Sequence, residues 1–209
     1  MSREILRIGM LHPVAAPITT EAEGQAITYG TGMVVGNAVS AEITWNRADT
    51  SHYGDDMEDA RDNGILSGNI SFVNSGIAQD VRIMLLGESQ IGTTGVYEIA
   101  ADASPYVGFG YARVLRKNGD TTYEALWLHK VQFAENTISD STKGESIEWG
   151  ETTLDGRIMG VRNDQTLATR YNQHKEFASA ADAIAWLDGK ANISSSSSSS
   201  SSSGTTGQT

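Results

Sequence analysis

The sequence contains no cysteine and no apolar run that could cross a membrane. With Cys 0 among 209 residues, disulfide bonds and thiolate chemistry are excluded, which predicts synthesis in a reducing compartment. No apolar run approaches the ~20 residues that a membrane helix needs. The opening residues, MSREILRIGMLHP, lack the long apolar core of a signal peptide. We therefore expect a soluble protein, and its length suits one domain.

Basic residues are also scarce. The chain has 15 Lys+Arg against 26 Asp+Glu, a formal net charge of -11. This balance argues against ordinary nucleic-acid binding, which needs a basic surface. The negative charge is still compatible with a protein that repels DNA and does not bind it.

Catalytic motifs are missing as well. The four histidines lie in unlike segments, without the spacing of a metalloprotease helix, and neither a nucleophile elbow nor a P-loop is present. The Gly30-x-Gly32 pair is followed by a β pattern rather than a helix start, so we interpret it as a bulge and not as a dinucleotide loop. For His129, beside Lys130 on a strand, we expect a structural or exposed role. The sequence predicts no enzyme, no cofactor and no metal site.

What the chain does have is a long β-hairpin over residues 105–133. Two runs of strand-forming residues flank Asn118 and Gly119, a pair that tight hairpin turns favour. Alternation after the turn predicts Trp127, Val131 and Phe133 on one face. A ribbon of this length is not stable alone, so it must join a larger sheet or a partner chain.

The most acidic segment lies between residues 46 and 64. Only Arg47 and Arg61 balance its carboxylates, which are Asp49, Asp55, Asp56, Glu58, Asp59 and Asp62. Their spacing does not match a calcium loop, although a cation site is one interpretation. A solvated loop is another. The third is an interface loop that meets the basic patch of another subunit, which its unusual length favours.

The remaining segments complete a mainly β prediction. Further strands are expected around Ile43, Ile70, Val96 and Ile147, and one helix is expected from a cap at Ser75 to a stop at Gly87. A second helix begins at Ser179 and ends before Gly189. Residues 1–25 are expected to form an N-terminal arm, residues 26–193 the β domain, and residues 194–209 a flexible Ser-rich tail. The predicted fold class is an antiparallel β-sandwich or partial barrel flanked by one or two α-helices, with a long hairpin and a long acidic loop.

Several segments also carry a resemblance to a known family. The order ITYGTGMVVGNAVSAEITWN, acidic loop, IMLLGE, PYVGFGYARVLRKNG, YEALWLHKVQF and TKGESIEWGETTLDGRIMG resembles the major tail protein of long-tailed bacteriophages, in the group from phages of Gram-positive hosts. The likeness runs from about Ala26 to Ile193, and DAIAWLDGKANI is similar to the closing helix of the family. The PYVGFG, LWL-x-KVQF and KGESIEW segments are its most specific parts.

The resemblance implies a structural virion protein without enzymatic activity. Such proteins form hexameric rings that stack into the tail tube, and strands from six subunits close one inner barrel through which genomic DNA is ejected. It implies as partners other copies of the chain, a tape-measure protein, a tail terminator and baseplate or distal tail proteins. Double-stranded DNA would pass through the lumen without specific binding. The implied location is the virion, after assembly in the host cytoplasm. Because some relatives carry an additional domain after a linker, the serine run is a candidate attachment point.

For the lumen we expect an acidic lining, since carboxylates give DNA no site at which to stall. The candidates, taken from alternation alone, are Glu42, Glu124 and Glu148. The alternative function is a carbohydrate- or surface-binding β-sandwich module that displays Trp and Tyr side chains. Self-assembly distinguishes the two, because the module would bind glycans as a monomer.

Overall fold

The structure is a computed structural model that describes residues 5–21, 26–54, 57–90, 96–97, 104–117, 119–139, 150–163 and 168–193. Within these residues the chain is mainly β and antiparallel, with two helices, as the sequence predicts. The predicted strand around Ile147 lies outside the described residues, and so does the serine tail. In the described part of the chain, neither helix is long and apolar enough to span a bilayer.

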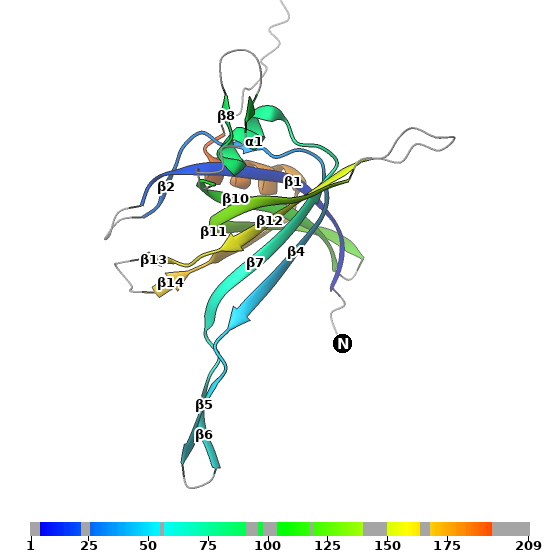
Figure 1. The fold of residues 1–209 in the computed structure, drawn as a ribbon. Helices are drawn as coiled ribbons and strands as arrows, with labels where there is room; N and C mark the ends of the chain where they lie inside the picture. Colours follow the sequence, from blue (N-terminus) through cyan, green and yellow to red (C-terminus); the bar gives the residue numbers. More distant parts are fainter. Residues whose placement is uncertain are drawn as a thin grey trace, which may run out of the picture.

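One large antiparallel sheet dominates the fold (Figure 1). Its strands run in the order β2 (Thr28–Tyr29), β1 (Ile5–Thr20), β10 (Tyr106–Lys117), β11 (Asp120–Ser139), β12 (Glu151–Ile158), β7 (Ile65–Asn74) and β4 (Ala38–Arg47). Two short additions pair at its sides, β3 (Met33–Val34) with β1 and β15 (Asn172–Phe177) with β11. Three small ribbons stand apart from it, namely β5 (Thr50–Gly54) with β6 (Met57–Asp62), β8 (Ser89–Gln90) with β9 (Val96–Tyr97), and β13 (Val161–Asn163) with β14 (Ala168–Arg170).

The central hairpin forms as predicted. Lys117 pairs with Asp120, which leaves a two-residue turn between β10 and β11. Gly119 in that turn has φ 97°, a conformation that glycine adopts without steric cost. The turn chemistry of the sequence therefore sets the register of the longest pair of strands.

A bulge in β11 overturns part of the predicted alternation. Phe109 pairs with Leu128 but Val107 pairs with Val131, so β11 contains one more residue than β10 between these pairs. The extra residue reverses the facing of everything beyond it. The prediction that Trp127 shares a face with Val131 and Phe133 is wrong, because Trp127 packs in a different hydrophobic cluster from the other two.

The two helices cover opposite faces of the sheet. On one face, α1 (Gln79–Leu86) buries Leu85 against a cluster in which the Phe109 ring meets Phe72 and Phe133, each at 5.2 Å between centroids. On the other face, α2 (Ala180–Ala191) buries Leu187 over Trp127. Each fully buried large apolar side chain contributes about 1.5–3 kcal/mol to folding. Both helices therefore gain their stability by packing against the middle strands β10 and β11.

The structure differs from the expectation of an N-terminal arm. Residues 5–20 form β1, which pairs with β10 along most of its length. Val14, Ala15 and Ala16 are all 0% exposed, and Ala15 faces the α1 cluster while its two neighbours face the α2 cluster. The small residues are required here because helices approach the strand from both sides.

The helix ends agree only in part with the sequence. Gly87 ends α1 in the left-handed conformation and Ser179 caps α2 by accepting a hydrogen bond from the Asp182 N–H, as predicted. The predicted cap at Ser75 is wrong, since α1 begins after Ala78 without a side-chain cap and the Ser75 N–H is donated to the Asn37 carbonyl. The second helix also continues through Gly189 to Ala191, because Asn192 supplies the left-handed ending.

A partly buried ion-pair cluster ties α1 to the sheet. The Arg82 guanidinium donates to Glu88 and Glu135, with Nη2 at 2.6 Å from each carboxylate. The hydrogen bonds that Arg82 donates to Glu135 and Glu88 outweigh the effect of burial and raise the pKa of Arg82. On the other face, His12 Nε2 lies 2.7 Å from Asp188 Oδ1 and links β1 to α2.

Candidate assembly surfaces

The segment that the sequence predicts as a long acidic loop forms a two-stranded ribbon. Thr50 pairs with Asp62 and Gly54 with Met57, so β5 and β6 extend the direction of β4 and β7 beyond the sheet. At its base the Ala48 N–H donates to the Gly64 carbonyl at 2.8 Å. Figure 1 shows this ribbon standing clear of the body.

The predicted acidic residues are concentrated on this ribbon. Asp49 lies at its base and is exposed, whereas Glu58, Asp59 and Asp62 belong to β6. Asp55 and Asp56 lie outside the described residues. Among the described elements, β5 and β6 make extended contact only with each other. A lone two-stranded ribbon is marginally stable in water at best.

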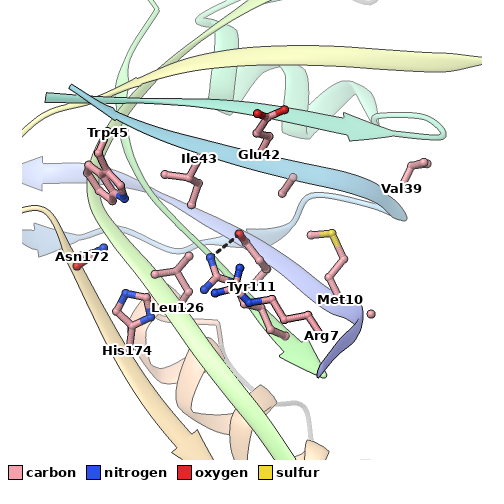
Figure 2. A pocket seen from close by; sticks show the side chains of 13 residues that line it. Arg7, Met10, Val39, Glu42, Ile43, Trp45, Tyr111, Leu126, Asn172 and His174 are labelled. Carbon is pink, nitrogen blue, oxygen red and sulfur yellow. Dashed lines mark hydrogen bonds between the residues drawn. The ribbon is translucent and has the colours of Figure 1, made fainter. Parts of the chain in front are cut away.

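The sheet curls but does not close, and a cavity marks the gap. β4 is the last strand, and it hydrogen-bonds only to β7 among the described strands. Between β4 and β1 lies a cavity of about 630 Å³. Figure 2 shows Ile43 and Trp45 extending from β4 toward Tyr111 and Leu126, while Glu42 lies on the other side of the strand. The unpaired edge of β4 is a template for another strand.

The lumen candidates do not come together. Glu42 is exposed on β4, and Glu124 is half-buried on β11, with β7 and β12 between these strands in the sheet order. Glu124 accepts a hydrogen bond from Arg113 at 3.2 Å and lies 3.3 Å from His174 Nδ1. Burial lowers the pKa of Arg113, but its contacts with Tyr111 and Glu124 prevail and the net shift is upward. The negative charge of Glu124 is therefore balanced by the nearby positive charge of Arg113. Glu148 lies outside the described residues.

A polar cluster beside α2 was not found by sequence reasoning. Trp127 Nε1 donates to the Tyr29 hydroxyl at 3.2 Å, and that hydroxyl donates to the His129 carbonyl at 2.9 Å. The Tyr29 and Trp127 rings meet edge to face at 5.3 Å. Tyr29 lies about a hundred positions before Trp127 and His129 in the sequence, so no local spacing could have indicated the contact.

His129 should make stability depend on pH. Burial, with smaller effects of Lys190 and Arg170, lowers its pKa from 6.5 to about 4. Between these values the unfolded chain binds the additional proton, so acidification destabilises the fold, by about 2 kcal/mol between pH 7.5 and pH 5 for this group. Urea unfolding of the wild type and His129→Gln at both pH values measures it. We expect the variant to lose that share of the pH dependence, and an equal dependence in both would contradict the assignment.

No family model and no curated protein matches this chain. Within the described residues, no group of three or more histidine, aspartate or glutamate side chains is placed to hold a metal ion. The structural features that bear on function are the acidic ribbon, the open sheet and the polar cluster beside α2.

Proposed function

We propose that the chain is a tail-tube subunit of a long-tailed bacteriophage. In this proposal copies form hexameric rings, the rings stack, and the resulting tube conducts genomic DNA into the host. The acidic ribbon β5–β6 carries the proposal, because its strands make extended contact only with each other among the described elements, and a lone two-stranded ribbon is marginally stable in water unless a partner covers it. The family resemblance of the sequence supports the same conclusion.

The open sheet supports lateral assembly. The unpaired edge of β4 exposes backbone donors and acceptors, which in a lone subunit invite uncontrolled pairing. Pairing with neighbouring copies around a closed ring removes these edges. The first half of β1 adds exposed apolar side chains, with Ile5, Leu6 and Ile8 each half or more exposed. Exposed apolar side chains at a strand end are available for burial against a neighbouring subunit.

The remaining partners follow from the resemblance. The tube would surround a tape-measure protein and end at a tail terminator on one side and baseplate or distal tail proteins on the other. In the finished virion, Glu42 would contribute a fixed negative charge to the DNA-facing wall, while the charge of Glu124 is offset by Arg113. Such a wall repels DNA only within a Debye length of about 8–10 Å, so it prevents sticking and supplies no driving force.

Negative-stain microscopy of the purified full chain tests this function. We expect rings or tubes of uniform width at raised protein concentration. A protein that stays monomeric at every concentration would contradict the proposal. Glycan binding by that monomer would instead favour the surface-binding module, although Trp127 is fully buried and Trp45 and Trp186 are half-buried.

A further inference from the structure

A small basic pocket lies between α2 and the β13–β14 ribbon. It has a volume of about 200 Å³, and Trp127 and His129 are among the residues that line it. Three cations surround it, Arg162 from β13, Arg170 from β14 and Lys190 from α2. No carboxylate side chain is among the described residues that line it. In a chain with a net charge of -11, a pocket of this composition is exceptional.

These cations lack the partners that other cations of the protein have. Arg82, Arg113 and Lys130 each form an ion pair with a glutamate. For Arg162, Arg170 and Lys190 the described part of the chain provides no such pair, and Lys190 lies instead over the Trp186 ring at 5.3 Å.

The local potential is accordingly positive. Burial and then the positive charge of Lys175 lower the pKa of Lys190, and burial followed by Lys190 and Arg170 lowers that of His129. An anion placed at the pocket would relieve this repulsion.

We propose that the basic pocket binds the acidic ribbon, residues 49–62, of a second copy of the chain. The ribbon carries six acidic residues against Arg61 alone, and its strands make no extended contact with α2, β13 or β14 of the same chain. The bound ribbon must therefore come from another subunit. Carboxylates at the pocket would form charge-assisted hydrogen bonds with the two guanidinium groups.

The same contact explains how assembly could continue without limit. Ribbon and pocket are different surfaces, so each subunit offers one donor and one acceptor. A heterologous contact that repeats head to tail generates closed rings or open helical stacks. The inference deepens the proposed function and rests on it, because it assigns the ribbon its acceptor in the next subunit of the tube.

Two complementary variants isolate the contact. The chain lacking residues 50–62 keeps only the pocket, and Arg162→Glu/Arg170→Glu keeps only the ribbon. Both arginines are exposed, so their replacement should leave the fold intact. Neither variant should associate through this contact alone, while a mixture should form a complex that contains both chains. Sedimentation with one chain fluorescently labelled measures it, and 1 M salt, where the Debye length falls to about 3 Å, should weaken it.

Three controls make the result specific. Arg116→Glu/Arg157→Glu changes the net charge equally at exposed sites outside the pocket and should associate like the wild type. The deletion chain with Arg162→Glu/Arg170→Glu added should bind the ribbon donor at least about 100-fold more weakly, since like charges then meet. Adding Glu58→Lys/Asp59→Lys to the full-length pocket variant should restore self-association.

The outcomes separate this inference from the tube proposal. Wild-type tubes that also form with Arg162→Glu/Arg170→Glu would overturn the inference and leave the proposed function standing. If the two variants form a mixed complex but the wild type never forms tubes, the inference stands and the proposed function is overturned. If the pair does not associate but inorganic phosphate or duplex DNA binds the wild type and not the pocket variant, the site belongs to that anion and the inference fails.

Discussion

Deletion of residues 50–62 is expected to give a folded subunit that no longer stacks into tubes. The ribbon stands clear of the body (Figure 1), and β5 and β6 make extended contact only with each other among the described elements, so the free energy of unfolding should change little. The deletion joins Asp49 to Asn63 and Gly64, which can form a tight turn between β4 and β7. Because Ala48 already hydrogen-bonds to Gly64, the shortened hairpin keeps its register. Thermal unfolding reports the fold, and electron microscopy reports tube length.

Shape and charge of the ribbon can be separated with a second variant. Glu58→Gln/Asp59→Asn/Asp62→Asn keeps the length of β6 and removes three negative charges. We expect tubes from this variant to be shorter and less sensitive to salt than wild-type tubes, whereas the deletion should abolish stacking entirely. Tubes of normal length from the deletion variant would refute the role given to the ribbon.

Replacement of Trp127 by alanine is expected to be the most destabilising single change considered for this fold. The side chain is 0% exposed, and its ring lies against Gly108 and Gly110 of β10 and Leu187 of α2. Removal of a buried Trp costs about 3–5 kcal/mol through lost transfer energy and a residual cavity. The change also removes the hydrogen bond to the Tyr29 hydroxyl. Urea unfolding followed by circular dichroism measures the loss.

Trp186→Ala is the matched control. Trp186 is half-buried on α2 and packs at the edge of the same cluster, so its loss should cost clearly less. Equal losses for the two variants would show that Trp127 is not the centre of the α2 cluster. The comparison also explains two glycines of the PYVGFG segment, because a Cβ on Gly108 or Gly110 would lie 2.4 Å or 2.6 Å from the Trp127 ring.

The sequence by itself determined the features that depend on neighbouring residues. Asn118 and Gly119 specified the hairpin turn, Ser179 specified the start of α2, and Gly87 specified the end of α1. The strand expected around Ile43 is β4, in which half-buried Ile43 and Trp45 alternate with exposed neighbours. Each of these depends on backbone conformation or periodicity within a few residues, which is information that a single sequence carries directly.

Only the tertiary structure decided the features that depend on distant contacts. The bulge in β11 reversed the facing of Val131 relative to Trp127, and no residue type near the bulge predicts the additional residue. β1 entered the sheet because its small residues fit between two helices that are encoded far downstream. The basic pocket likewise joins β13, β14 and α2. Long-range packing and charge placement selected these arrangements, and they appear only when all the elements are assembled.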